Sequence, residues 1–266
     1  MNDFIFLIKN FFTHKDFLPP PDTLAGTLFT PLHWIFAAVV LSALIFGAIS
    51  LSKKDEKSIR RIFLGIWITV TCLEVVKIIW ETYSGRTVNL ELAGVLPLYP
   101  CSIFMYAMPL AIWGKGYIRD MGCGYVCTLG LLGGAINFVY PANILSNYSC
   151  ISFAGFHTFL YHGSIVFCAL VMLMSRYHSY KNVSKAWQLL LPSVPALAVS
   201  VVANAVNFSK INSDYMFFKL DSFIFAPIGA ALPTPICVLI VYAIYLFIHA
   251  LPYIPSYIVN KRRSRA

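Results

Sequence analysis

The chain has 266 residues, of which 59% are hydrophobic and only 12% are charged, and its mean hydropathy is +0.73. A soluble globular chain carries roughly 25% charged residues, so this composition excludes soluble, disordered, coiled-coil and collagen-like proteins. What remains is an all-α polytopic membrane protein built as a helical bundle. The net charge of +9 would suggest a nucleic-acid partner for a soluble chain. In a membrane protein the basic residues belong to loops and face anionic headgroups, so we expect membrane lipids, and no nucleic acid, as partners.

Residues 1–31 are expected to form an N-terminal interfacial segment. Its start is aromatic and apolar, but Asp3, Lys9 and Lys15 interrupt the apolar run. The run is too short to cross a bilayer and lacks the small-residue cleavage site of a signal peptide. An interfacial helix is the simplest interpretation, and the three prolines at 19–21 would end it.

Seven apolar stretches follow within residues 32–252, and each approaches the roughly 20 residues that cross a bilayer as a helix. The third is short and is flanked by Pro97 and Pro100. The segment 207–232 before the last stretch is interpreted either as re-entrant or as an ordinary loop with interfacial aromatic residues. The predicted spans are His33–Leu51, Ile62–Trp80, Leu98–Trp113, Met121–Tyr140, Gly155–Ser175, Trp187–Val206 and Pro233–Leu251.

The charges in the loops predict the orientation of these spans. Fourteen Lys and Arg residues follow the first, third, fifth and seventh spans, whereas five lie in the alternate segments. The positive-inside rule then places the N-terminus outside and the C-terminus inside. Residues 253–266 are accordingly expected to be a basic cytoplasmic tail of a multi-pass protein of the plasma membrane.

The polar residues inside the spans gather at one depth. At ~1.5 Å per residue they all fall in the outer half of the membrane, and the inner halves hold almost no ionisable group. In one interpretation Glu74 and Lys77 pair along their helix and only staple the bundle. In the other, which the additional polar residues favour, the set lines a cavity that opens outward. The set consists of Glu74, Lys77, Asn137, His157, His162 and Asn204.

Cys101 has the most suggestive local chemistry among the seven cysteines. If Pro100 occupies the first position of a helix, Cys101 lies in the first turn, where the helix dipole favours a thiolate. A nearby histidine would act as its base. The alternative is a buried cysteine that behaves as a small hydrophobe, which is the interpretation of the other six.

Other patterns in the spans favour packing over chemistry. His157 and His162 are five residues apart, roughly 140° around a helix, so they form a poor metal-binding pair. Phosphate-loop, dinucleotide, nucleophile-elbow and zinc patterns are absent, and we therefore expect no metal and no cofactor. Steps of three and four residues predict a single close-packing face for Cys123, Cys127, Gly130 and Gly134.

Three short blocks carry a family resemblance: LPLYPCS at residues 96–102, FHTFLYHG at 156–163 and DYMF at 214–217. With the order of helices from about Ile62 to Leu251, these blocks resemble the YwaF-like bacterial integral membrane family, which is related to eukaryotic transmembrane protein 164. That relative is regarded as a phospholipid acyltransferase. More distantly, it resembles the androgen-induced membrane hydrolases, which cleave fatty-acid esters. The resemblance implies Cys101 as the acyl-accepting nucleophile and His162 as its general base, with His157 as a second candidate.

Two functional hypotheses of different classes follow, with a structural role as a third. The first is a lipid acyltransferase or lipid-ester hydrolase that uses Cys101 and His162 near the outer leaflet. The alternative is a small-molecule transporter or receptor, whose outward-facing pocket would be lined by Glu74, Lys77, Asn137 and Asn204. In the third, all of these polar groups only hold helices together.

Overall fold

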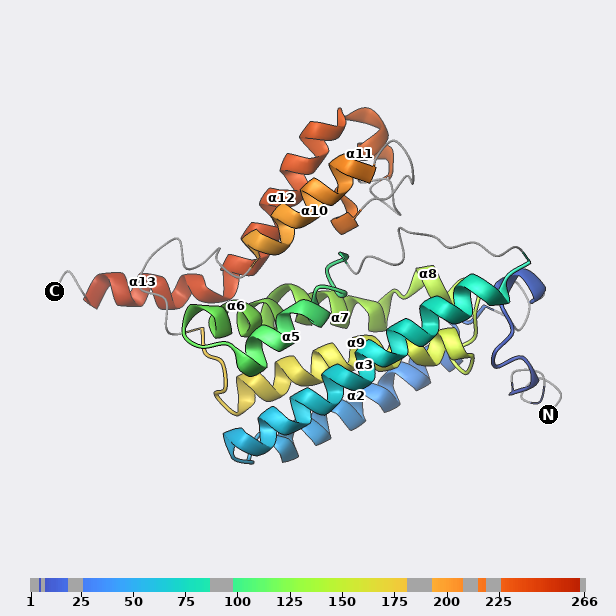
Figure 1. The fold of residues 1–266 in the computed structure, drawn as a ribbon, viewed down its shortest axis with the longest axis horizontal. Coiled ribbons are helices and arrows are strands. Elements are labelled where there is room, and N and C mark those ends of the chain that lie inside the picture. Colours follow the sequence, from blue (N-terminus) through green and yellow to red (C-terminus); the bar gives the residue numbers. More distant parts are fainter. Residues whose placement is uncertain are drawn as a thin grey trace. The chain divides into compact units, whose positions relative to one another are not determined.

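A computed structural model describes residues 5, 8–18, 26–86, 98–180, 193–207, 215–218 and 226–263. Within these ranges all regular structure is helical (Figure 1), as the composition predicts. The elements in chain order are η1 (Lys15–Phe17), α2 (Pro31–Leu51), α3 (Glu56–Ser84), α5 (Phe104–Trp113), α6 (Tyr117–Tyr125), the π-helical η2 (Val126–Gly130), α7 (Leu131–Val139), α8 (Ala142–Leu145), α9 (Phe153–Met174), α10 (Val194–Asn207), η4 (Tyr215–Phe217), α11 (Ala226–Ala231), α12 (Thr234–Ala250), η6 (Leu251–Tyr253) and α13 (Ile254–Arg263).

Five of the described helical stretches are long and apolar enough to cross a membrane, which confirms an all-α polytopic membrane protein. Two shorter apolar helices, α5 and α10, occupy the places of the predicted third and sixth spans. The count of seven spans and their orientation stay predictions. The five long stretches are Pro31–Leu51, Glu56–Ser84, Tyr117–Leu145, Phe153–Met174 and Thr234–Arg263.

Local sequence explains where the first two long helices begin. Thr30 caps α2 by accepting from the backbone N–H of His33, and Pro31 occupies the first helical position, where its missing N–H costs nothing. Asp55 caps α3 in the same way through the N–H of Ser58 at 3.1 Å.

The predicted start of the third span near Leu98 is wrong. Residues 99–103 form consecutive turns, with the N–H of Phe104 donating to the carbonyl of Cys101 at 3.2 Å, and α5 begins only at Phe104. Pro100 explains why Leu98 and Tyr99 are not helical, because it disfavours helical geometry at the residue before it. Cys101 therefore lies in a turn ahead of the helix. The predicted sixth span began at Trp187, and residues 181–192 lie outside the described part of the chain.

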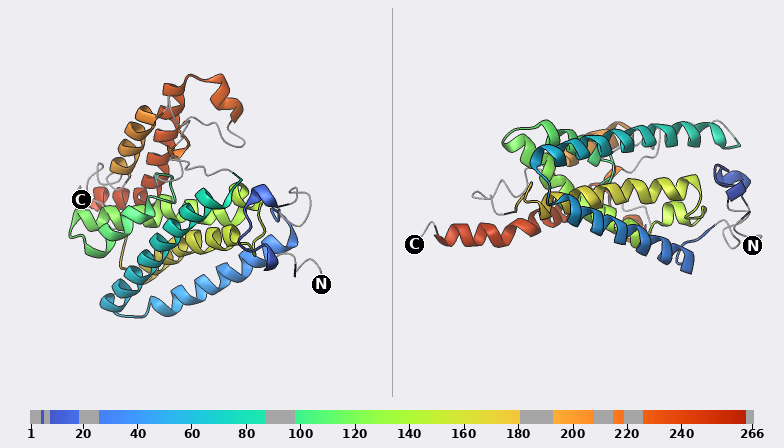
Figure 2. Two further views of the ribbon diagram at one scale, coloured as in Figure 1. Left: turned by 45° about the vertical axis from the view of Figure 1, so that its right-hand side comes forward. Right: turned by 90° about the horizontal axis from the view of Figure 1, so that it is seen from below.

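The chain divides into two compact units, and each is described by itself. Unit 1 comprises Met1–Glu91 and Leu131–Met174. Its centre is α9, against which α2, α3 and α7 pack (Figures 1 and 2). Gly134 on α7 permits this approach, because a Cβ there would lie 3.0 Å from the carbonyl oxygen of His162 on α9. Buried side chains at this contact include Phe138, Phe159 and Val166.

Unit 2 comprises Leu92–Gly130 and Ser175–Ala266. Here α5 and α6 pack closely, since a Cβ on Gly122 would overlap the backbone of Ala107 and Ala111. The helix α12 contacts η2 and α10. Small residues thus set the closest helix approaches in both units, as membrane helix packing requires.

The prediction that the small residues share a single helix face is wrong, because the helix contains the π-helical turn η2. Val126–Gly130 is π-helical and fully buried, so the straight-helix spacing that joined Cys123 to Gly134 is interrupted between them. A π-bulge adds one residue to the local turn, and it therefore turns the positions that follow onto another side of the helix.

Candidate functional site

The first polar cluster lies between α3 and α9 of unit 1. The carboxylate of Glu74 is 3.2 Å from Nε2 of His157 through one oxygen and 3.5 Å from Nζ of Lys77 through the other. Lys77 also lies 3.7 Å from the carboxylate of Glu81. The distance to His157 is that of an ion pair, although its ring N–H is not aligned for a hydrogen bond. The structure thus brings together three of the residues that the sequence predicts for a site.

His162 is one and a half turns further along α9 and has a defined tautomer. Its Nδ1 lies 2.8 Å from the backbone carbonyl of Thr158, which accepts only, so Nδ1 carries the proton. Nε2 then presents a lone pair. That atom is buried and has no hydrogen-bond partner among the described residues. A neutral imidazole held in this way is suited to accept a proton.

Two further groups extend the same face of the cluster. Thr71, one turn before Glu74 on α3, has a buried hydroxyl without a hydrogen-bond partner in the described ranges. The ring of Tyr161 stacks on His157 with centroids 5.7 Å apart and meets His162 edge-on at 5.5 Å. Buried polar atoms normally have partners, so these atoms indicate a place where water or a ligand group binds.

Cys101 lies in unit 2 and is half-buried. The fully buried Tyr125 of α6 donates its hydroxyl to the carbonyl of Pro100 at 3.2 Å, which holds the peptide next to Cys101. All seven cysteines lie in the described ranges, and none forms a disulfide.

A second element supports the turn that contains Cys101. The ring of Tyr99 packs against Tyr215 at 5.8 Å and against Phe217 at 5.2 Å, so the blocks at 96–102 and 214–217 meet in unit 2. Met216 and Phe217 both have left-handed backbones, with φ of 59° and 56°. Such strain costs of order 1–3 kcal/mol per residue and persists only where contacts enforce it.

Asn204 makes two of the contacts that hold this backbone in place. Its side-chain amide donates to the carbonyl of Tyr215 and accepts from the N–H of Tyr215, both at 2.9 Å. The hydroxyl of Tyr245 on α12 donates to the carbonyl of Met216 at 3.1 Å. The polar groups of Asn204 are therefore engaged by the backbone of η4. Asn137 is half-buried on α7 of unit 1.

Sequence reasoning missed a buried polar group around η2 in unit 2. Nδ1 of His249 on α12 lies 2.6 Å from the hydroxyl of Thr128, which also donates to the carbonyl of Gly124 at 2.8 Å. Nε2 of His178, in the loop after α9, lies 3.0 Å from the hydroxyl of Tyr253. Burial lowers the pKa of His178 to about 4, and the charge of Arg119 lowers it further. The only sequence signal for this buried polar group was that His178 and His249 lie near the ends of apolar stretches.

The described residues contain no group of three or more His, Cys, Asp or Glu arranged to hold a metal ion. The chemistry available is instead proton transfer by imidazole, ion pairing by Glu74 and Lys77, and thiol chemistry at Cys101.

The long apolar helices and the buried ionic cluster define a polytopic α-helical membrane protein that contacts lipids. A model of the TMEM164 family matches residues 28–259. The chain therefore belongs to the TMEM164 family, and the resemblance carried by the three short blocks is confirmed. No curated protein and no solved structure matches the chain.

Proposed function

We propose that this protein is a membrane enzyme that transfers or hydrolyses lipid acyl groups, with Cys101 as nucleophile and His162 as general base. The observation that carries the proposal is the state of His162. Its Nδ1 is fixed by the carbonyl of Thr158, and its buried Nε2 has no hydrogen-bond partner among the described residues. The acyl chemistry is what the family resemblance implies, and apolar helices that face lipid give the substrate access.

In the proposed reaction, the sulfur of Cys101 attacks the ester carbonyl as a general base takes the thiol proton, the role that the family resemblance implies for His162. The C–O bond of the ester breaks, a thioester forms on Cys101, and the leaving alcohol takes the proton from the imidazolium. A second hydroxyl, from a lysolipid or from water, then loses its proton to His162 and attacks the thioester. The thiol is regenerated, and the acyl group has moved to the acceptor.

Glu74, Lys77, His157 and Asn137 are proposed to bind the polar part of the substrate. A carboxylate and an ammonium 3.5 Å apart offer complementary charges for a polar headgroup. We assign Asn204 to the support of η4, because both of its polar groups already bind Tyr215. The proposed setting is the outer leaflet of the plasma membrane, with the N-terminus outside and the tail in the cytoplasm.

The experiment combines lipid analysis with thiol labelling in cells that express variants. Cys101→Ala and His162→Gln are expected to abolish the change in lipid composition that the wild type produces, and Cys101 is expected to react with an acyl-mimicking thiol probe. Cys72→Ala, which removes an exposed cysteine on α3, serves as the matched control and should behave as wild type. Unchanged lipids in the wild type, together with a Cys101 inert to the probe, would exclude the enzyme.

The buried ionic cluster also favours a second candidate, a transporter or receptor. Glu74 ion-pairs with Lys77 and lies 3.2 Å from Nε2 of His157, an arrangement that a small polar solute can open. This function predicts uptake or binding that is lost in Glu74→Gln and retained in Cys101→Ala. The enzyme differs from it at Cys101, because Cys101→Ala is expected to abolish acyl transfer.

A further inference from the structure

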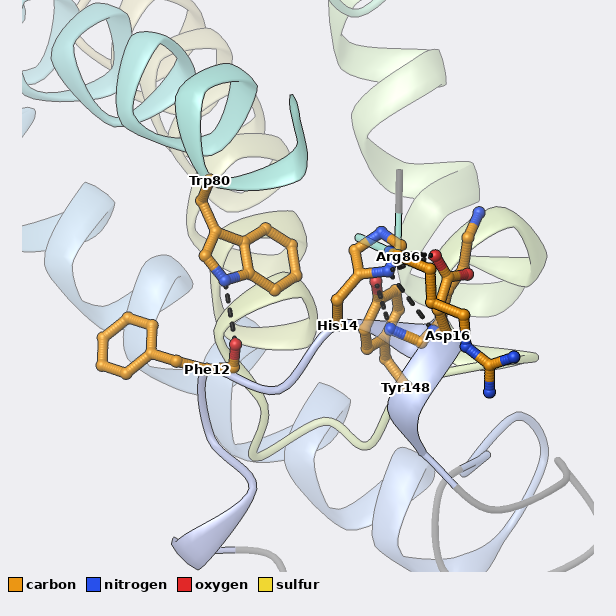
Figure 3. Close-up of polar contacts among 7 residues, drawn as sticks. Phe12, His14, Asp16, Trp80, Arg86 and Tyr148 are labelled. Atoms are coloured by element: carbon orange, nitrogen blue, oxygen red, sulfur yellow. Dashed lines mark hydrogen bonds and ion pairs between the residues drawn. The ribbon is translucent and has the colours of Figure 1, made fainter. Parts of the chain in front are cut away.

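The N-terminal strap, defined as residues 8–18, is docked on the end of unit 1 where α3 ends and α9 begins (Figure 3). Two of its carbonyl groups accept hydrogen bonds from the bundle. The indole N–H of Trp80 donates to Phe12 at 2.9 Å, and the backbone N–H of Phe153 donates to Phe11 at 2.8 Å. The strap therefore occupies a defined seat on this part of the bundle.

Polar contacts of His14, Lys15 and Asp16, here called the lock, also hold the strap. The carboxylate of Asp16 accepts from the backbone N–H of Arg86 at 3.0 Å and lies 3.2 Å from Nδ1 of the buried His14. The hydroxyl of Tyr148 accepts from the backbone N–H of Lys15 at 3.1 Å. Figure 3 shows these groups converging on η1.

Gly85 makes room for the lock. A Cβ at this position would lie 3.1 Å from the carboxylate of Asp16 and 3.4 Å from the ring of His14. The backbone of Gly85 is extended, with φ of −75°, so any residue fits its conformation. A side chain at position 85 would therefore crowd the strap, because the three atoms nearest to its Cβ all belong to Asp16 and His14.

The strap contacts the bundle next to the cluster of Glu74, His157 and His162. Phe153 is one helical turn from His157 on α9, and their rings are 6.3 Å apart. Phe12 of the strap packs on Phe153 at 5.3 Å, and Trp80 packs on it at 5.1 Å. The strap thus contacts Phe153, and the ring of Phe153 is the neighbour of the ring of His157.

The strap is held by these few contacts and by little burial. Phe12 is 64% exposed and Phe17 57% exposed. Of its described residues only His14 is buried. Each hydrogen bond contributes modestly, so the strap can leave its seat without unfolding the bundle.

We propose that the N-terminal strap is a gate, which closes the Glu74–His157–His162 cluster when docked through Asp16 and Gly85 and admits ligand when lifted. The gate is independent of which ligand enters and of whether Cys101 carries out acyl transfer.

The test measures access to the two histidines in the full-length protein in lipid nanodiscs. Diethyl pyrocarbonate modifies accessible neutral imidazoles, and mass spectrometry gives the rate for each histidine. Asp16→Ala and Gly85→Val are expected to raise the modification rates of His157 and His162 by roughly tenfold, the effect of losing about one hydrogen bond. Gly65→Val is the matched control on α3, where nothing lies within 4 Å of the new Cβ, and it should leave both rates unchanged.

Two further measurements make the outcome decisive. Hydrogen exchange of residues 8–18 reports whether the strap has lifted, and the buried His249 of unit 2 reports general loosening. Faster exchange in the strap without faster modification of His157 and His162 would overturn the gate, as would an equal rise at His249. A disulfide between Asp16→Cys and Gly85→Cys is expected to suppress modification of both histidines below the wild-type rate, and reduction is expected to restore it. A locked strap with wild-type modification rates would equally overturn the proposal.

Discussion

Glu74 is the residue whose charge connects the α3–α9 cluster, because it pairs with a lysine on its own helix and a histidine on the next. A carboxylate inside a membrane helix is costly unless it is paired. The sequence predicts that Glu74 lies close to Lys77, since three residues separate them on a helix. Its neighbour His157 on α9 is set only by tertiary packing, so the spacing of residues along the chain does not predict this contact.

Glu74→Gln is expected to destabilise the bundle by about 1–3 kcal/mol, because it leaves Lys77 and His157 without their shared anion. Unfolding in a denaturing detergent titration measures this loss. Glu81→Gln is the matched control. Its side chain is 42% exposed and its contact with Lys77 is longer, at 3.7 Å, so the change should stay below about 1 kcal/mol. Equal effects of both substitutions would contradict the central place of Glu74.

His178 makes the stability of the protein depend on pH. Its pKa in the folded protein is about 4, against an ordinary value of 6.5. Between these values the unfolded chain binds a proton that the folded one does not, so stability rises with pH. The groups around the ring are the hydroxyl of Tyr253, the ring of Tyr180 and the charge of Arg119. Stability should therefore be complete above about pH 6.5 and fall as pH decreases toward 4.

The size of this effect is of order 3 kcal/mol at pH 4, following from the difference between the two pKa values. Thermal unfolding followed between pH 7 and 4 measures it. His178→Gln should flatten the slope over this window, and an unaltered slope would assign the pH dependence to another group.

At the scale of elements, glycines determine which helices approach one another. The sequence predicts close packing along the fourth span, and the structure shows it at Gly122 against α5 and at Gly134 against α9. It did not predict that the two glycines serve different neighbours. Twelve residues separate them, about 120° around a regular helix, and the π-helical turn between them, which no residue type in the segment signals, changes this angle further. The late start of α5 was foreseeable in part, because Pro100 restricts Tyr99 before it.

Gly134→Ala is expected to destabilise unit 1 by about 1–3 kcal/mol, because its Cβ would meet the backbone of His162 and the side chain of Val166, both at 3.0 Å. Gly65→Ala, in open space on α3, should instead be neutral or stabilising by up to about 1 kcal/mol through helix propensity. Detergent unfolding of the two variants compares them directly. A loss at Gly65 as large as that at Gly134 would contradict the assignment of the Gly134 effect to close packing against α9.

At the scale of the molecule, composition alone predicts the class of protein, since a chain with 12% charged residues cannot cover a soluble surface. The five long spans follow from apolar length. The division into two units does not, because it depends on contacts between segments far apart in the chain, such as α2 with α9. For the same reason Glu74 and His157 could be assigned one depth, but not a distance of 3.2 Å.

The orientation is open to a direct test. The positive-inside rule predicts that the tail after α13 lies in the cytoplasm, so a cysteine introduced as Ser264→Cys should react with an impermeant maleimide only after the membrane is opened. Thr13→Cys, in the strap, should react from outside in intact cells. The reverse pattern would invert the topology, and reaction of both from one side would require an even number of spans.

The π-helical turn at Val126–Gly130 has a further consequence for the tolerance of the chain to deletion. Such a turn holds one residue more than a turn of α-helix, so a chain one residue shorter here is expected to form an unbroken α-helix. At 100° per residue, that helix would present another side of α7, and not Gly134, to α9. A deletion of one residue within 126–130 should therefore disturb this packing, and a second-site change that restores a small residue facing α9 is the suppressor that selection should then recover.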